Sequence, residues 1–331
     1  MKYNKLGRTG LSVSRLCLGT GTFGQQADEN ESHAILDRAV SAGINYIDVA
    51  DVYPPADQFR LTGRSEEIVG RWLKGKRDQI IVTTKGGAPV GPLPWDRGCS
   101  RKHLLDAIDA SLRRLDTDYV DFYLLHVDDA TVPLDEALEA LDTIVRSGKA
   151  RYIGVSNFLA YRLARAIGRA EVLRTARPVV VQPRYNLLFR QIERELLPLA
   201  QEENVAVTPY NPLAGGLLTG KHRFEEKPDT GRFSAEVGAF GAMYRDRYWH
   251  QREFSTIEKL TGLAKQNNRS LITLSVAWLL ANPVVSSVIL GASRVGQLDD
   301  SLAAADWDLD SALKAQLDEA TVEYRWGDAA R

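Results

Sequence analysis

The sequence predicts an α/β barrel, and three features of the chain support this fold class. Eight short apolar segments alternate with helical patterns between Arg15 and Leu290. Each segment is a continuous apolar run, as in strands that are buried on both faces of a parallel sheet. Three consecutive segments carry ionisable side chains at their C-terminal ends, where such barrels place their active sites. We therefore expect a (β/α)8 TIM barrel with an N-terminal β-hairpin and additional C-terminal helices, in a single domain of residues 1–331.

The expected elements follow one another in a regular order. A β-hairpin comes first, at residues 2–14, around a Gly-Arg-Thr-Gly turn. The barrel strands are expected at 15–19, 46–47, 80–85, 119–126, 152–156, 179–182, 205–209 and 288–290. The helices are expected at 31–42, 65–73, 100–115, 133–147, 159–170, 191–203, 252–266, 273–281, from 295 onward and at 311–319. Asn30 is a candidate N-cap and Gly43 a candidate stop for the first helix, and residues 210–250 are expected to form a long loop.

Composition narrows the class of protein. A net charge of −1 gives no reason to expect a nucleic acid or a membrane surface as a partner. Only Cys17 and Cys99 occur, which argues against a disulfide framework and is typical of a reducing cytosol. The N-terminus has no secretory pattern, and the longest apolar stretch is interrupted by Asn282-Pro283. We expect a cytoplasmic protein with a small-molecule substrate, and no sequence feature indicates an oligomeric state.

Four residues near the strand ends form the candidate catalytic set: Asp48, Tyr53, Lys85 and His126. Each alone would have an ordinary structural role, but together at consecutive strand ends they predict an active site. An ammonium beside a phenol lowers the pKa of the phenol toward the working range, so Tyr53 could protonate a developing alkoxide. Asp48 would hold Lys85 in place, and His126 would hydrogen-bond the same reacting oxygen. The two electrons must then come from a hydride cofactor.

Other chemistries receive less support from the sequence. Gly19-Thr-Gly-Thr-Phe-Gly24 matches a dinucleotide-binding fingerprint, but residues 25–30 separate its last glycine from the first helix, which argues against a Rossmann fold. The glycines suit a tight loop, and Thr20 and Gly21 could still let a ligand approach the backbone. The five histidines show no paired ligand spacing, so no metal site is expected. No G-x-S-x-G elbow indicates a serine hydrolase.

An ordered series of motifs resembles the aldo-keto reductase superfamily from Leu6 to about Asp300. The motifs are Leu6–Ser14, Gly43–Tyr53, Gly63–Glu66, Thr84–Lys85, Asp118–His126, Ile153–Asn157, Gln182 with Tyr185–Asn186, Tyr210–Lys221, and Val288–Ser293 with Gln297–Leu298. The Asp, Tyr, Lys and His tetrad of that family falls on Asp48, Tyr53, Lys85 and His126. The resemblance implies a barrel that binds NADP(H) across its C-terminal mouth and reduces carbonyl groups, or oxidises alcohols or sugars in reverse.

The resemblance also implies the residues that hold the cofactor. Ser156, Asn157 and Gln182, with Asp48 beside them, would hold the carboxamide, and Tyr210 would stack on the nicotinamide. The pyrophosphate would lie along Asn211, Pro212, Leu213, Ala214 and Gly215, with Lys221 and Arg232 meeting phosphate charge. The adenosine end would be surrounded by Gly291, Ser293, Arg294, Gln297 and Asp300. Arg294 would either contact a 2′-phosphate, which favours NADP over NAD, or remain solvated. Asp300-Ser301 departs from the Glu-Asn pair that relatives often carry there.

Two matters stay open at the level of sequence. Aromatic residues of the loops and tail could line the substrate pocket or simply pack: Trp95, Phe240, Tyr244, Tyr248, Trp249, Tyr324 and Trp326. The alternative function is an NADP(H)-binding redox-sensing or scaffolding subunit that resembles the potassium-channel β subunits. Those subunits lack the histidine of the tetrad, so His126 favours an enzyme. A barrel isomerase or lyase without nicotinamide is a third reading.

Overall fold

The predicted barrel is confirmed. The computed structural model describes residues 1–55, 59–226, 228–234 and 237–326. Its strands are β1 (Tyr3–Lys5), β2 (Ser12–Ser14), β3 (Leu16–Gly19), β4 (Tyr46–Asp48), β5 (Ile81–Gly86), β6 (Val120–Leu125), β7 (Ala150–Ser156), β8 (Val180–Gln182), β9 (Ala206–Val207) and β10 (Val288–Gly291). Strands β3 to β10 form one parallel sheet in the order β10-β3-β4-β5-β6-β7-β8-β9. The N–H groups of Ser286 and Ile289 donate to the carbonyls of Val207 and Pro209, which closes the sheet between its two edges.

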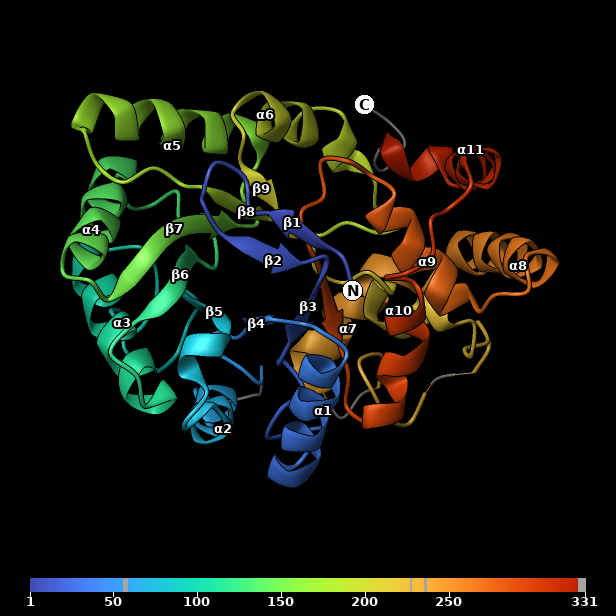
Figure 1. Cartoon of the computed structure of the whole chain (residues 1–331), viewed down its shortest axis with the longest axis horizontal. Helices are drawn as coiled ribbons and strands as arrows, with labels where there is room; N and C mark the ends of the chain where they lie inside the picture. The colour runs from blue at the N-terminus through green and yellow to red at the C-terminus, as the bar shows by residue number, and fades with distance from the viewer. Residues whose placement is uncertain (56–58, 227, 235–236, 327–331) are drawn as a thin grey trace.

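Helices surround the strands (Figure 1). They are α1 (Glu29–Ser41), α2 (Arg64–Leu73), α3 (Arg101–Leu115), α4 (Leu134–Arg146), α5 (Ala160–Leu173), α6 (Leu196–Glu202), α7 (Gly238–Tyr248), α8 (Gln251–Gln266), α9 (Leu271–Leu280), α10 (Asp299–Ala303) and α11 (Ser311–Ala320). Short 3-10 turns are η2 (Arg77–Gln79), η3 (Gln191–Glu193), η4 (Ala214–Thr219), η6 (Val295–Leu298) and η7 (Val322–Arg325). No helix in the described ranges has the length and apolar character needed to cross a membrane.

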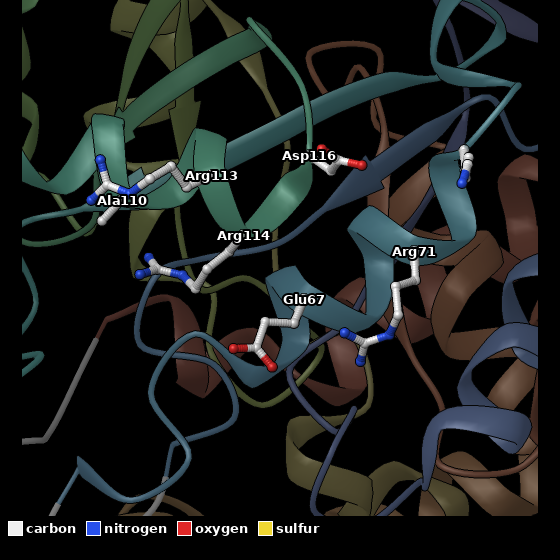
Figure 2. Close-up of a pocket in the computed structure, with 7 residues that line it drawn as sticks. Glu67, Arg71, Ala110, Arg113, Arg114 and Asp116 are labelled. Carbon is white, nitrogen blue, oxygen red and sulfur yellow. The ribbon is translucent and has the colours of Figure 1, made fainter.

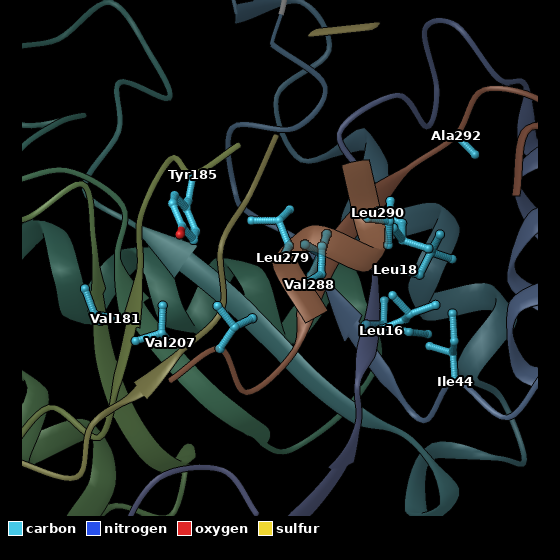
Figure 3. Close-up of a cluster of buried hydrophobic side chains, with 14 of the residues drawn as sticks. Leu16, Leu18, Ile44, Val181, Tyr185, Val207, Leu279, Val288, Leu290 and Ala292 are labelled. Carbon is cyan, nitrogen blue, oxygen red and sulfur yellow. The ribbon is translucent and has the colours of Figure 1, made fainter. Parts of the chain in front are cut away.

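The core has two parts because strand side chains alternate between the two faces of the sheet. Outward-facing residues such as Leu16, Leu18 and Val288 pack with the helices in the larger cluster (Figure 3). Inward-facing residues fill the barrel, and this inner cluster also contains Leu6 and Val13 of the hairpin. The turn at Gly7 lies against the starts of β8 and β9. The hairpin therefore closes the N-terminal end of the barrel and leaves the C-terminal end for a site.

Three details differ from the sequence-based expectations. The N-cap of α1 is Asp28 rather than Asn30, and its carboxylate accepts from the N–H of Glu31. The helix expected at 191–203 is divided into η3 and α6. The expected loop at 210–250 contains η4 and α7. The pattern of α7 was missed because Gly238 and Gly241 lower its helix propensity.

Candidate active site

The barrel brings the predicted catalytic residues to one end of the sheet. Strand β4 ends at Asp48, Lys85 is the penultimate residue of β5, and His126 follows β6 directly. Residues on neighbouring strands are in parallel register, with Asp48 opposite Thr83 and Lys85 opposite Leu124. The three side chains therefore belong to successive strand ends, as predicted.

Lys85 is held by a buried ion pair. Its ammonium is fully buried and donates to Asp48 Oδ1 at 2.5 Å and to the carbonyl of Val49 at 2.9 Å. Gln182 donates its amide to the other oxygen of Asp48 at 2.7 Å. Burial alone would lower the pKa of Lys85, but Asp48 and the phenol of Tyr53 outweigh burial and raise it. Lys85 therefore stays positively charged at neutral pH.

Tyr53 lies beside this ammonium. The Nζ of Lys85 is 4.9 Å from the centre of the Tyr53 ring, and the ring centres of Tyr53 and His126 are 5.6 Å apart at an edge-to-face angle of 80°. Burial raises the pKa of Tyr53, and the charge of Lys85 opposes that rise without reversing it. Lys85 lowers the pKa of Tyr53 as expected, but the net change in this pKa is upward because desolvation of the phenolate is the larger effect. Tyr53 thus keeps its proton at neutral pH and can act as an acid.

His126 is neutral in this environment. Burial and the neighbouring Lys85 lower the pKa of His126 to about 3. Its Nδ1 is buried and, within the described residues, has no hydrogen-bond partner. A neutral imidazole can donate one hydrogen bond to a reacting oxygen without adding charge.

Polar side chains at or just beyond the ends of β7, β8 and β9 extend the site. Ser156 Oγ donates to the carbonyl of Gln182 at 2.9 Å. Asn157 donates to the carbonyl of His126 at 2.9 Å and accepts at 2.7 Å from the hydroxyl of Tyr210. The amide and hydroxyl groups of the expected carboxamide site are therefore gathered beside the catalytic set.

The segment after Tyr210 has an unusual backbone. Asn211, Ala214 and Gly215 have φ values of 66°, 50° and 75°, and the 211–215 stretch includes Pro212 and Leu213. Asn211 Oδ1 accepts from the N–H of Gly215 at 2.5 Å, which fixes the turn. The N–H of Ala214 also donates to the carbonyl of Asn211, at 3.0 Å, so the amides of Ala214 and Gly215 are both engaged within the turn.

Several aromatic candidates support this segment or pack elsewhere. Tyr248 is buried and its hydroxyl accepts from Asn211 at 3.1 Å. Tyr244 is buried against Gly215, where a Cβ would lie 2.5 Å from its ring. Tyr324 is buried and hydrogen-bonded to Thr256 at 2.9 Å. These three tyrosines therefore pack inside the protein. Trp95 and Trp326, in contrast, are more than half exposed.

The expected phosphate and adenosine residues lie around the end of β10. Arg232 donates to the hydroxyl of Tyr244 at 2.8 Å, and its guanidinium lies 3.6 Å from where a Cβ of Gly291 would be. Ser293 donates its N–H to Gln297 at 2.8 Å. The side chains of Lys221, Arg294 and Asp300 are exposed. At the start of η6, Glu31 accepts the N–H of Val295 at 2.7 Å.

The glycine-rich loop is part of the barrel mouth and not of a Rossmann fold. Thr20 is buried, and both its N–H and its hydroxyl donate to the carbonyl of Asp48, at 3.0 and 3.1 Å. Gly21 faces Tyr53, since a Cβ there would lie 3.8 Å from the ring. At Gly24 a Cβ would lie 2.4 Å from Arg64, so that glycine serves packing against α2.

Sequence reasoning missed the residues that hold the loop of Tyr53 in place. The N–H of Ser65 donates to the carbonyl of Tyr53 at 3.1 Å, and its hydroxyl donates to Thr20. Glu66 is fully buried and binds both Thr84 and Arg114. The Gly63–Glu66 motif was visible in the sequence, but no local pattern showed which distant residues it would contact. The described residues contain no group of three or more His, Cys, Asp or Glu side chains placed to hold a metal.

Comparison with known proteins agrees with this geometry. The model of the aldo/keto reductase family matches residues 15–321. The chain belongs to the aldo/keto reductase family. Among similar proteins, a probable voltage-gated potassium channel subunit beta from Arabidopsis thaliana is 38% identical, with 92% of each chain covered. An uncharacterized oxidoreductase of Bacillus subtilis (strain 168) is 37% identical over 96% of this chain and 95% of its own. An L-glyceraldehyde 3-phosphate reductase of Escherichia coli (strain K12) is 34% identical over 92% of this chain and 87% of its own.

Proposed function

We propose that this chain is an NADP(H)-dependent oxidoreductase that reduces an aldehyde or ketone, or oxidises the corresponding alcohol or sugar in the reverse direction. The observation that carries the proposal is the buried Asp48–Lys85 pair beside Tyr53 and neutral His126. Family membership and relatives named as oxidoreductases support the same class. The substrate is a small molecule.

The residues at the mouth fit a nicotinamide cofactor. The amides and hydroxyls of Ser156, Asn157 and Gln182 are suited to a carboxamide, and the ring of Tyr210 to a flat heterocycle. The guanidinium of Arg232, which lies near Gly291, is suited to phosphate. When bound, NADPH supplies the hydride that the carbonyl carbon accepts.

Side chains of this protein donate the proton to the carbonyl oxygen and stabilise the charge that forms. Tyr53 donates its phenolic proton to the carbonyl oxygen, which becomes the alcohol oxygen. Lys85 stabilises the phenolate that remains, and Asp48 keeps Lys85 charged and oriented. His126 donates a hydrogen bond to the same oxygen and orients the carbonyl.

We assign NADP rather than NAD as the preferred cofactor. Arg294 is exposed beside Ser293, at the expected adenosine end. A guanidinium binds a 2′-phosphate with two parallel hydrogen bonds. Titration of tryptophan fluorescence with NADPH and NADH is the test, and tighter binding of NADH would overturn the assignment.

Replacement of the acid tests the reaction. Tyr53→Phe should lower carbonyl turnover by about 100-fold or more, the usual contribution of general acid catalysis. NADPH binding should persist, because the phenol oxygen is not needed to hold the cofactor. Tyr161→Phe, at an exposed position on α5, is the matched control. Undiminished turnover in Tyr53→Phe would remove Tyr53 from the catalytic role.

A second function deserves its own test because a relative bears the name of a channel subunit. In this alternative the chain holds NADP(H) as a redox-sensing or scaffolding subunit and does not need rapid turnover. Stable NADPH binding without turnover of any member of a broad carbonyl panel would favour it. Turnover that depends on Tyr53 would favour the enzyme.

A further inference from the structure

The loop that carries Tyr53 is fastened to β5 at Asp51. The N–H of Asp51 donates to the carbonyl of Lys85 at 3.1 Å. In the same loop, the carbonyl of Val49 accepts from the ammonium of Lys85 at 2.9 Å. The backbone and the ammonium of Lys85 are thus both bonded to the segment that leads to Tyr53. Whatever holds Asp51 in place therefore helps to set the position of Tyr53 relative to Lys85.

The carboxyl group of Asp51 is buried without a partner. It is 1% exposed, and neither of its oxygens has a hydrogen-bond partner among the residues that the structure describes. The nearby cations are engaged elsewhere, since Lys85 binds Asp48 and Arg114 binds Glu66 at 2.7 Å. Figure 2 shows Arg114 near the end of α3, next to α2. A carboxylate with neither a cation nor a donor is very costly to bury, so Asp51 is buried as the neutral acid.

The hydroxyl of Tyr123 is also buried without a partner at this end of β5. Tyr123 lies on β6, is fully buried, and points into the outer cluster between the sheet and the helices. Its Oη has no hydrogen-bond partner within the described ranges. A Cβ on Gly86 would overlap this oxygen, so the hydroxyl rests against the backbone of the residue that follows Lys85. Asp51 and Tyr123 therefore approach the same end of β5 from its two neighbouring strands.

Titratable groups of four elements lie around Asp51. Burial, and then the charge of Glu66 on α2, raise the pKa of Asp51, whereas Arg114 on α3 and Lys85 on β5 oppose this rise without reversing it. Burial, and then the charge of an ionised Asp51, raise the pKa of Tyr123 on β6. The two groups are therefore close enough for the charge of one to act on the other. A neutral carboxyl and a phenol each offer one donor and an acceptor, so each can satisfy the other.

We propose that Asp51 is a positioning residue: as a neutral acid it shares a hydrogen-bond link with Tyr123, and this link holds the loop of Tyr53 against the Lys85 end of β5. A small side-chain rotation or one buried water completes the link. The link lies outside the barrel interior, so Asp51 acts only through the loop that it holds. The kinetic part of this inference rests on the proposed reductase activity, whereas the neutral acid and its link do not.

Infrared difference spectroscopy tests the neutral acid and its link without any turnover. The spectrum of the wild type minus that of Asp51→Asn at pH 7 should contain the C=O stretching band of a protonated carboxylic acid. The same difference in a Tyr123→Phe background should contain this band at a shifted frequency, because the acid loses its hydrogen-bond partner. Carboxylate bands in place of the acid band would overturn the neutral acid. An acid band that Tyr123→Phe leaves unmoved would overturn the link.

Turnover and NADPH affinity test the positioning role. Asparagine keeps the donor and the acceptor of the neutral acid, so Asp51→Asn should keep a kcat close to that of the wild type. Tyr123→Phe and Asp51→Leu should each lower kcat by about tenfold or more, because a small displacement of a reacting group is costly. Binding of NADPH should stay unchanged in both. The double variant Asp51→Leu/Tyr123→Phe should be no slower than either single variant, since each already breaks the link.

The variant Tyr185→Phe separates positioning from a general loss of stability. Tyr185 is buried, and its hydroxyl bonds to Glu193 at 2.8 Å and to Asn282 at 3.3 Å. Removal of this hydroxyl should lower the melting temperature and leave kcat unchanged. Full kcat in Tyr123→Phe, or equal losses in Asp51→Asn and Asp51→Leu, would overturn the positioning role. A wild type that reduces no carbonyl would contradict the proposed reductase activity, and the infrared experiment would still decide whether the neutral acid and its link exist.

Discussion

At the scale of single residues, His126 has a charge state that its environment fixes. Folded His126 has a pKa of about 3, whereas an unfolded histidine binds a proton below about 6.5. As pH falls below about 6.5, the unfolded chain binds a proton at this histidine and the folded chain does not, so the folded state loses stability. Between pH 7 and 5 the unfolding free energy of the wild type should fall by about 1–2 kcal/mol more than that of His126→Gln. Urea unfolding measures this, with exposed His250→Gln as the control, and equal losses would contradict the neutral imidazole.

Asp51 titrates in the opposite sense. It is 1% exposed, and its carboxylate oxygens have no hydrogen-bond partner in the described part of the chain. Burial and the neighbouring Glu66 raise the pKa of Asp51 well above its usual range. Its contribution to stability is therefore greatest below the unfolded pKa of about 4 and declines as pH rises toward the folded pKa.

The variant Asp51→Asn cannot ionise. Between the unfolded and the folded pKa of Asp51, only the unfolded wild-type chain carries the ionised aspartate. Over this range the variant should become more stable than the wild type by about 1.4 kcal/mol for each pH unit. Melting temperatures at pH 4 and pH 7 test this, with a difference expected at pH 7 and little at pH 4. Exposed Asp78→Asn is the control. A loss of stability at pH 7 would show that Asp51 is ionised and needed as an anion.

At the scale of elements, the first turn of α2 positions the loop of Tyr53. Gly63 and Gly75 flank this helix with nearly equal φ values of 81° and 79°. A Cβ on Gly63 would meet Arg114, whereas a Cβ on Gly75 would have no atom within 4 Å. Both alanine variants carry the same backbone strain of about 1 kcal/mol, and Gly63→Ala should lose about 1–3 kcal/mol more. Urea unfolding gives the difference, and equal losses would mean that Arg114 moves aside freely.

At the scale of the whole molecule, Arg190 ties the C-terminal helix to the barrel. Its guanidinium is buried and donates to Glu193, to the carbonyl of Asp318 and to the hydroxyl of Thr321, each at 2.8 Å. Arg190→Met should lower the unfolding free energy by about 3 kcal/mol, because the largely buried Glu193 loses its partner. Lys102→Met, which removes the exposed pair with Asp106 within α3, should change it by less than about 0.5 kcal/mol. Similar losses in both variants would contradict this role of Arg190.

Packing, rather than local pattern, determined several properties of the site. Lys85 was expected to lower the pKa of Tyr53. In the structure Lys85 does so, but burial raises this pKa by more. Tyr244 and Tyr248 were open candidates for the substrate pocket, and the structure buries them under the 211–215 segment. The bonds of Glu66 to Thr84 and Arg114 join residues 18 and 48 positions apart, a relation that no short motif encodes.

The sequence by itself determined the barrel and the set of residues at its C-terminal end. Continuous apolar runs specify strands buried on both faces, and parallel strands must end at the same edge, so Asp48, Lys85 and His126 had to meet. The tertiary structure alone decided the protonation states and the partners that hold the loop of Tyr53. These depend on how deeply each group is buried and on which distant charges approach it, and neither quantity is a property of a local stretch of chain.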